Sequence, residues 1–251
     1  MSIDKPLPVR VLHIASGDLW AGAEMQLYTL AKALNNSADI IIDIVLLNHG
    51  ELEKKLLNSG ISIIVLDESK LSSLLVLWKL TGVVRHVKPD IIHTHRLKEN
   101  VLGCLAALLI GNIPTIRTVH GASEHAPSWR QLSKHINYWL DYVCGRYLQH
   151  AIIAVSEDLA ESLKKDFSVD KIHVIQNGID VEEASNQITE EDSKHHSDNF
   201  CIGFAGRLVP VKRVDILIKT ARYILDKYPE LNISFHIYGD GPLRYELEQL
   251  N

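Results

Sequence analysis

The chain has 251 residues, of which 46% are apolar and 23% charged, a composition typical of a soluble protein with one large or two modest domains. A net charge of −5 argues against a broad nucleic-acid-binding surface, so any anion site must be local. The three cysteines are isolated along the sequence, which argues against a disulfide framework or a zinc site and fits a reducing compartment. Because no signal peptide is recognisable and the longest apolar run, 101–110, is too short to span a bilayer, we expect a soluble, cytoplasmic protein.

Apolar runs alternate with helical patterns along the first 180 residues. Strands are predicted at 9–15, 39–47, 62–66, 91–95, 114–119, 151–155 and 172–175, and helices at 51–58, 71–87, 98–110 and 131–148, with further helices beginning near 23 and after Ser156, which is expected to cap its helix. This alternation predicts an α/β domain with a parallel sheet covered by helices on both faces. Ligands of such sheets bind at the carboxyl ends of the strands.

The character of the sequence changes at 181–198, which is acidic and polar and has no periodicity, so we expect a linker between domains. The alternation then restarts, with strands predicted at 200–205 and 233–238 and helices at 214–228 and 242–250. Two strands and two helices would leave an unpaired apolar edge, and we therefore expect the chain to stop inside its second domain. The predicted organisation is a first domain at 1–180, a linker at 181–198 and an incomplete second domain at 199–251.

The stretch 200–214, FCIGFAGRLVPVKRV, suggests an anion site. An apolar run stops at Gly206, Arg207 follows at once, and Lys212 lies five positions further on, where a helical pattern begins. A strand that runs through glycine into a helix start can present backbone N–H groups to an anion. A guanidinium and an ammonium there suit a phosphate or diphosphate. The alternative is a solvated turn that is basic because most arginine and lysine side chains lie on surfaces.

Two other turns are candidates for ligand contact. The first turn, 17–22, lacks G-x-G-x-x-G, and no acidic residue ends the second strand in the place that would hold a ribose, which disfavours a dinucleotide-binding oxidoreductase. Gly22 either forms a tight turn into the helix or lets the backbone approach a ligand, and Glu24 is expected to favour the helix dipole. Gly241 lies in the turn 239–242, which is a plain connection or lines the same pocket as Arg207.

Three histidines stand at predicted strand ends. His93 is expected to be packed and hydrogen-bonded, whereas His95 fits that interpretation and a ligand-facing one equally well. His120 precedes Gly121 and a long loop, which favours a ligand-facing donor or an acid/base role. No carboxylate or thiol nearby in sequence completes a ligand set, so a metal site is disfavoured.

The helix near Tyr138, Trp139 and Tyr142 is rich in aromatic residues. Such a helix can lie against a membrane, but apolar aromatic side chains in a helix are more often part of a core. We expect these three side chains to be buried.

Five groups of residues, taken together, resemble the retaining glycosyltransferases of the GT-B fold in family 4. They are WAGAE at 20–24, DIIHTH at 90–95, TVHG at 118–121, AVS at 154–156 with NGID at 177–180, and GRLVPVK at 206–212 with YGDGPLR at 238–244. The resemblance implies two Rossmann-like domains that face each other across a cleft. The N-terminal domain would hold the acceptor, the second would bind a nucleotide-sugar donor, and no metal or other cofactor would be needed.

The resemblance also implies roles for residues on the donor side. Arg207 and Lys212 would be catalytic and, with Gly206, would bind the donor diphosphate. Gly22 would belong to the loop that approaches the diphosphate and the acceptor. Gly241 would lie in the turn that shapes the nucleotide pocket.

On the acceptor side, the resemblance implies that His120 is a catalytic residue near the transferred sugar and that His95 and Gly121 lie close to the acceptor. The sequence departs from the family pattern at Ala21, where the family often has a second glycine. The family's pair of glutamates, eight positions apart, would lie beyond Asn251.

The function implied is transfer of a sugar from a nucleotide-diphosphate donor to a hydroxyl of a glycan or lipid-linked acceptor, with retention of configuration, in surface polysaccharide or glycolipid synthesis. Peripheral contact with the inner membrane would fit such a role, and no nucleic-acid partner is expected. One alternative is a catalytically incompetent, truncated remnant or binding module. A further alternative is a sugar-nucleotide epimerase, which can share the two-domain architecture.

Overall fold

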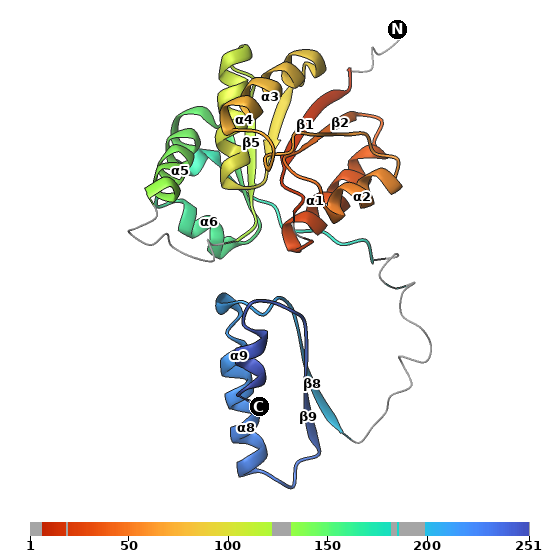
Figure 1. Ribbon diagram of the computed structural model, residues 1–251, viewed down its shortest axis with the longest axis vertical. Helices are drawn as coiled ribbons and strands as arrows, with labels where there is room; N and C mark the ends of the chain where they lie inside the picture. Colours follow the sequence, from red (N-terminus) through yellow and green to blue (C-terminus); the bar gives the residue numbers. More distant parts are fainter. Residues whose placement is uncertain (1–6, 19, 122–131, 182–184, 186–198, 251) are drawn as a thin grey trace. The chain divides into compact units, whose positions relative to one another are not determined.

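The computed structural model describes residues 7–18, 20–121, 132–181, 185 and 199–250, without the side chains of 132–134. The chain divides into two compact units, Met1–Asp180 and Val181–Asn251, which Figure 1 shows as the red-to-green and blue parts of the ribbon. The linker expected at 181–198 lies outside the described residues except for 181 and 185. Among the helices of the described residues, none is long and apolar enough to cross a bilayer.

Seven parallel strands form the sheet of the first unit, in the order β3-β2-β1-β4-β5-β6-β7. The strands are β1 Val9–Ala15, β2 Ile40–Leu46, β3 Ile63–Val65, β4 Ile91–Thr94, β5 Thr115–Val119, β6 Ala151–Ala154 and β7 Ile172–Val174. The helices are α1 Gly22–Asn35, α2 Glu51–Asn58, α3 Ser73–Val87, α4 Leu97–Ile110, α5 Leu132–Val143 and α6 Glu157–Leu163, with a π-helical turn at Cys144–Leu148 and a 3-10 turn at Val169–Lys171. The prediction of an α/β domain with a parallel sheet is confirmed.

Alternation along the central strands builds a core on each face of this sheet. Leu12 and Val45 point toward α3 and α4, whereas Ile44 and Leu46 point toward α1 and α2. The strand order reverses between β1 and β4, and in sheets of this kind the carboxyl ends of the two strands at the reversal border the ligand-binding crevice. The residues at the carboxyl ends of β1 and β4 are therefore the candidates for a ligand site in this unit.

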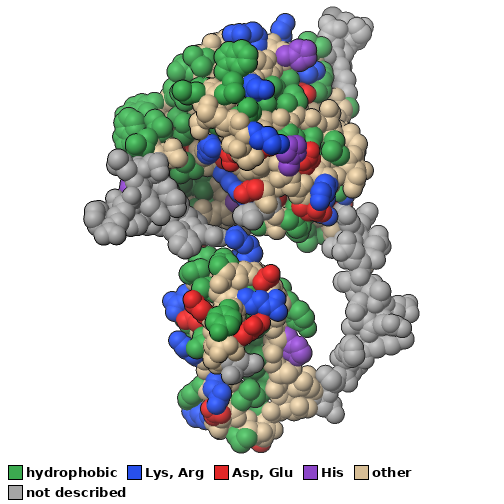
Figure 2. Space-filling view, viewed as in Figure 1, with side chains coloured by type: hydrophobic (Ala, Val, Ile, Leu, Met, Phe, Trp, Pro, Cys, Tyr) green, Lys and Arg blue, Asp and Glu red, His purple; other side chains and the backbone are tan. Residues whose placement is uncertain are grey.

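The aromatic residues of α5 do not form a core, and the prediction of burial is wrong. Trp139 is 63% exposed and Tyr142 39% exposed, while Tyr138 is half-buried. Figure 2 shows hydrophobic side chains gathered on the surface over α5. The side of α5 that faces the sheet carries Asp141, whose carboxylate forms an ion pair with Arg117 of β5. Because Trp139 lies two positions before Asp141 in the helix, its side chain points away from the sheet.

The second unit contains two parallel strands, β8 Phe200–Ala205 and β9 Ile233–Tyr238, with helices α8 Val214–Lys227 and α9 Arg244–Glu248. Its buried centre consists of Leu208, Val214 and Leu247. The helical pattern expected to begin at Lys212 is split in two. Pro210–Lys212 is a 3-10 turn, and Arg213 adopts the left-handed conformation, with φ 49°, before α8 begins.

Candidate active site

A group of four histidines occupies the carboxyl ends of β1, β4 and β5. His13 of β1 lies opposite His93 of β4 in the strand register, His95 follows β4, and His120 follows β5. All but His120 are buried. The sequence interpretation missed His13, because a single histidine inside an apolar strand carries no local signal and its neighbours become visible only through the pairing of β1 with β4.

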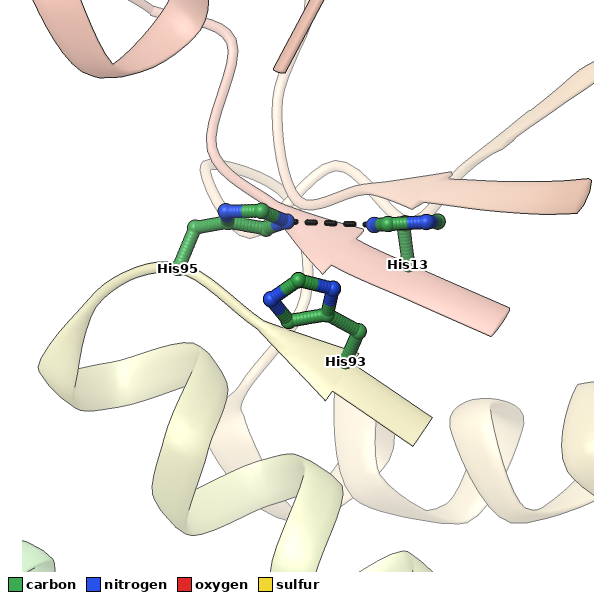
Figure 3. Close-up of side chains that lie close together, drawn as sticks. All are labelled: His13, His93 and His95. Carbon is green, nitrogen blue, oxygen red and sulfur yellow. Dashed lines mark hydrogen bonds between the residues drawn. The ribbon is translucent and has the colours of Figure 1, made fainter. Parts of the chain in front are cut away.

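These rings are joined by hydrogen bonds and by stacking. His13 Nδ1 lies 3.2 Å from His95 Nε2, as Figure 3 shows together with His93. His95 Nδ1 lies 3.3 Å from His120 Nε2. His93 Nε2 lies 2.8 Å from the hydroxyl of Thr118, as expected of a packed, hydrogen-bonded histidine. The ring of His93 also stacks on that of His95, with centroids 4.5 Å apart.

Burial keeps these imidazoles neutral at pH 7. It lowers the pKa of His13 to about 4. Burial, followed by repulsion from neighbouring imidazoles, lowers the pKa of His93 and His95 well below the usual value. The pKa of His120 falls to about 4 because of burial and the nearby charge of Arg96. Each ring therefore carries one N–H and one acceptor nitrogen near neutrality.

The cluster resembles a hydrogen-bonded stack more than a metal centre. His13, His93 and His95 offer nitrogens that lie within 4.8 Å of one another. The stacked arrangement of His93 and His95 presents ring faces to each other rather than directing both lone pairs at one point.

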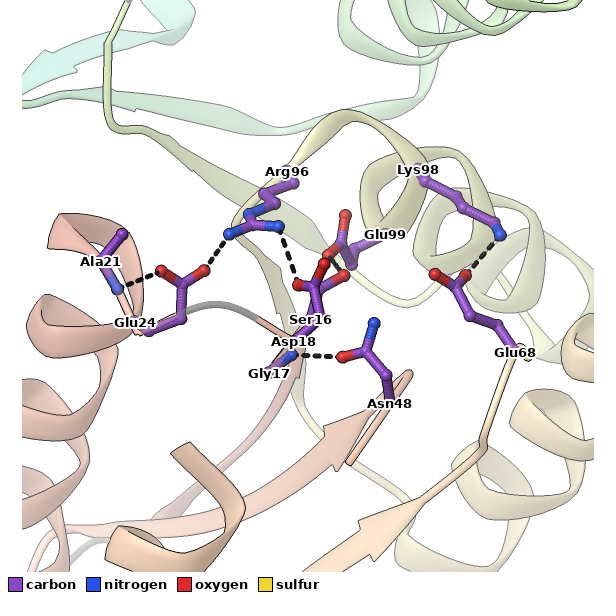
Figure 4. Close-up of polar contacts among 10 residues, drawn as sticks. All are labelled: Ser16, Gly17, Asp18, Ala21, Glu24, Asn48, Glu68, Arg96, Lys98 and Glu99. Carbon is purple, nitrogen blue, oxygen red and sulfur yellow. Dashed lines mark hydrogen bonds and ion pairs between the residues drawn. The ribbon is translucent and has the colours of Figure 1, made fainter. Parts of the chain in front are cut away.

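Arg96 connects the first turn to the end of β4 (Figure 4). Its guanidinium lies 3.3 Å from Asp18 and forms an ion pair with the buried carboxylate of Glu24. The second oxygen of Glu24 accepts a hydrogen bond of 3.1 Å from the backbone N–H of Ala21. Glu24 thus caps α1, in line with its expected role at the helix start, and also binds Arg96, whose part in the site the sequence did not reveal.

A second buried carboxylate lies beside this turn. Glu99 of α4 accepts a hydrogen bond from the hydroxyl of Ser16, and burial raises the pKa of its carboxyl group. The backbone N–H of Gly17 donates to the side-chain oxygen of Asn48. The first turn is therefore held by side chains from three other segments. A Cβ atom at Gly22 or Gly121 would meet no atom within 4 Å, so internal packing does not require glycine at either position.

In the second unit, the turns after β8 and β9 pack backbone against backbone. The N–H of Leu208 donates to the carbonyl of Asp240 at 2.9 Å, and the N–H of Leu243 donates to the carbonyl of Leu208 at 3.1 Å. A Cβ atom at Gly241 would lie 2.5 Å from that carbonyl oxygen, and one at Gly239 would overlap the carbonyl of Gly206. This close approach fixes the path of the chain on both sides of Arg207.

The predicted cationic residues lie at the two ends of this turn. Arg207 directly follows Gly206, Lys212 ends the 3-10 turn, and both side chains are exposed. The start of α8 carries an ion pair of its own, with Arg213 Nε 3.1 Å from Asp215. Since Asp215 already supplies a carboxylate there, the predicted anion site depends on the turn rather than on the first turn of α8.

The predicted site residues therefore fall into two groups. Gly22, His95, His120 and Gly121 belong to the first unit, where the structure brings His95 and His120 into contact. The second unit contains Gly206, Arg207, Lys212 and Gly241, and the packing of its two turns brings the segments around Gly206 and Gly241 together.

Residues 20–183 match Glycosyltransferase Family 4, and the chain belongs to this family. The predicted resemblance to this family and the predicted GT-B type of fold are confirmed.

The chain is also similar to individual relatives and solved structures. Over 185 residues the chain is 32% identical to the UDP-Gal:alpha-D-GlcNAc-diphosphoundecaprenol alpha-1,3-galactosyltransferase of Escherichia coli, with 71% of this chain and 46% of the relative covered. The structure of Anabaena HepE in complex with UDP and glucose is similar with a TM-score of 0.71 at 20% identity, covering 96% of this chain and 65% of that one. A UDP-GlcNAc 2-epimerase from Neisseria meningitidis, bound to UDP-GlcNAc, has a TM-score of 0.56 at 18% identity, covering 96% and 68%. The chain thus spans about half the length of the first relative and about two thirds of the two structures.

Proposed function

We propose that the protein transfers a sugar from a nucleoside-diphosphate donor to an acceptor hydroxyl with retention of configuration, in the synthesis of a surface polysaccharide or glycolipid. The observation that carries the reaction class is the match of residues 20–183 to Glycosyltransferase Family 4. The name of the Escherichia coli relative supports a UDP-sugar donor and an acceptor linked to a lipid diphosphate. The UDP and glucose bound to Anabaena HepE support the same class of donor.

The donor diphosphate is assigned to the turn after β8. Negative charge builds on the leaving diphosphate as the bond to the sugar breaks, and preorganised cationic groups stabilise that charge. Arg207 and Lys212 supply two such groups at the ends of one turn. The backbone packing of Gly241 against Leu208 holds the turn in place before the donor binds.

In the first unit, His120 is assigned to the sugar that is transferred, and His95 and Gly121 to the acceptor side. A pKa of about 4 leaves His120 neutral at pH 7, so it has no extra proton to give as a general acid. Its proposed role is therefore that of a neutral hydrogen-bonding partner. Gly22, at the start of α1, is assigned to close backbone approach by the ligand, because no protein atom fills the space beside it.

Titration calorimetry of the purified chain with UDP, GDP and ADP tests the donor site. We expect one of the three to bind and Arg207→Ala to weaken its affinity by about tenfold or more, since a hydrogen bond between charged groups is lost. The matched control is Arg222→Ala, because Arg222 is an exposed arginine of the same unit whose Nε lies 3.4 Å from a carboxylate oxygen of Asp226. Absence of binding by all three nucleotides, or equal affinities for the two variants, would refute the assignment.

Transfer itself is tested with a radiolabelled UDP-sugar and a lipid-diphosphate-linked acceptor. Arg207→Ala is expected to lower turnover by on the order of a hundredfold or more, because it removes a group that stabilises the transition state.

The fold likeness to a UDP-GlcNAc 2-epimerase makes epimerisation the second candidate function. Proton NMR of UDP-GlcNAc incubated without acceptor separates the two: an isomerised UDP-sugar indicates an epimerase, and acceptor-dependent release of UDP indicates a transferase.

A further inference from the structure

Three of the four histidines form a continuous chain of hydrogen bonds. His95 uses both of its ring nitrogens, with Nε2 3.2 Å from His13 Nδ1 and Nδ1 3.3 Å from His120 Nε2. The two remaining nitrogens at the ends, His13 Nε2 and His120 Nδ1, are buried and have no hydrogen-bond partner among the described residues. His93 stacks beside this chain and is engaged with Thr118 instead.

Such a chain allows only two arrangements of its protons. A neutral imidazole has one N–H and one acceptor nitrogen, so the donor in each contact fixes the donor in the next. In one arrangement all three rings carry the proton on Nδ1, and His120 Nδ1 is a free N–H donor. In the other, all three carry it on Nε2, and His13 Nε2 is a free N–H donor. The tautomer of His120 is thus linked to that of His13 through His95.

Burial favours the first arrangement. Each arrangement leaves one buried N–H without an acceptor among the described residues, at His120 Nδ1 in the first and at His13 Nε2 in the second. His13 is 0% exposed as a whole residue, so neither water nor a ligand can approach its Nε2 without a rearrangement of the sheet. His120 is half-buried and is followed by the exposed Gly121, so the end of the chain that lies nearer to solvent is the one at His120.

We propose that His13 and His95 are positioning residues, which hold His120 in the Nδ1–H tautomer so that it presents a hydrogen-bond donor to an oxygen of the bound sugar. This role rests on the proposed function for the identity of the ligand, but the linkage of the three rings does not. The chain moves no net charge and requires no proton from solvent. Its effect is to choose between a donor and an acceptor at one position.

Long-range proton–nitrogen NMR of the protein labelled with 15N-histidine tests the linkage in the unmodified chain. We expect His13, His95 and His120 all to show the Nδ1–H tautomer at pH 7. A ring among the three with the opposite tautomer, or an even mixture of the two forms, overturns the proposal. This measurement does not depend on nucleotide binding, so its failure is distinguishable from failure of the donor site at Arg207.

Two matched substitutions of His95 test the direction of control. An asparagine amide lies near the position of a histidine Nδ1, and a glutamine amide near that of Nε2. His95→Asn is therefore expected to keep the contact with His120 and the Nδ1–H tautomer of that ring. His95→Gln is expected to lose the contact, so that the neutral ring of His120 exchanges between its Nδ1–H and Nε2–H tautomers. Equal 15N shifts of His120 in the two variants would overturn the positioning role.

Activity provides a second readout. Because the effect acts through the orientation of one donor, His95→Gln is expected to lower kcat by about tenfold or more relative to His95→Asn, with a smaller change in the KM of the UDP-sugar. If both variants unfold, His13→Asn, which keeps an amide near the Nδ1 position of His13, and His13→Phe provide the same comparison. A merely structural role of His13 would change the stability of these two variants without changing the tautomer of His120, and that result would overturn the proposal.

Discussion

The ion pair between Arg117 and Asp141 offers a direct test of what holds α5 to the sheet. Arg117 Nη1 lies 2.8 Å from Oδ1 and 2.7 Å from Oδ2 of Asp141, and the two side chains are only 9% and 15% exposed. Asn100 donates a further hydrogen bond of 2.7 Å to Asp141, and the guanidinium lies 4.8 Å from the ring centre of Phe167. Removal of Asp141 would leave one buried positive charge and one buried amide donor without their partner.

Asp141→Ala is therefore expected to lower the free energy of unfolding of the first unit by about 3–5 kcal/mol. Arg117→Met is expected to cost less than that, since Asp141 keeps its hydrogen bond from Asn100. The double variant Arg117→Met/Asp141→Leu should be more stable than Asp141→Ala alone, because apolar side chains of similar volume leave no buried charge.

Urea denaturation followed by tryptophan fluorescence measures these differences. All four tryptophans lie before residue 181, so the signal reports on the first unit. Arg10→Ala is the matched control, because Arg10 forms a 3.4 Å ion pair with Asp43 in which the side chains are 38% and 29% exposed, and its loss should cost about 0–1 kcal/mol. The reasoning is refuted if Asp141→Ala destabilises the unit no more than Arg10→Ala does, or if the double variant is less stable than both single ones.

Three further predictions follow from single contacts. Gly241→Ala should weaken UDP binding by about tenfold or more in calorimetry, because the new Cβ atom would lie 2.5 Å from the carbonyl oxygen of Leu208. The control is Gly203→Ala, whose Cβ atom would meet no atom within 4 Å and which should leave the affinity unchanged. Equal affinities of the two variants would contradict the proposed role of the turn. Burial lowers the pKa of His13 to about 4, so the folded state resists protonation of this ring. The contribution of the neutral ring to the free energy of unfolding is complete above the unfolded pKa of about 6.5 and is lost as the pH falls from 6.5 to 4, by about 3 kcal/mol. The urea midpoints of the wild type and His13→Asn should therefore converge across that range, and a constant difference between the two midpoints would argue against this account. Ser156→Ala should cost about 1 kcal/mol through loss of the 3.3 Å cap to the backbone N–H of Leu159, and Ser156→Asn should restore most of it; a thermal melt in which all three proteins coincide would show that the cap contributes nothing.

Strand positions were predictable wherever an apolar run was bounded by residues that cannot continue it. The predicted strands 9–15, 200–205 and 233–238 coincide with β1, β8 and β9. In the last two, Gly206 and Gly239 follow the strand directly, so local sequence sets the end of the strand. The helix cap at Ser156 was equally local, because one side chain accepts from a backbone N–H three residues away.

What the sequence could not provide were contacts between distant segments. His13 joins His95 over 82 positions, and Arg96 joins Glu24 over 72, so neither pair leaves a local pattern. Trp139 was misplaced because the inward position of α5 depends on Arg117 of another element. The roles of Arg207, Lys212 and Gly22 remain predictions, to be decided by the binding and transfer measurements.

The ion pairs of Arg96 also connect the two parts of the sheet that meet at β1 and β4. Asp18 and Glu24 follow β1, in the half of the sheet that contains β1, β2 and β3, while Arg96 follows β4, in the other half. Four residue pairs, from Val11–Ile91 to Ile14–Thr94, join β1 to β4, compared with seven between β1 and β2. Arg96 therefore links the segments that follow β1 and β4, beyond the last paired residues of these two strands. Removal of Arg96 would take away both of these ion pairs, and we therefore expect the segments after β1 and β4 to separate more easily at the end of the sheet that carries the histidines.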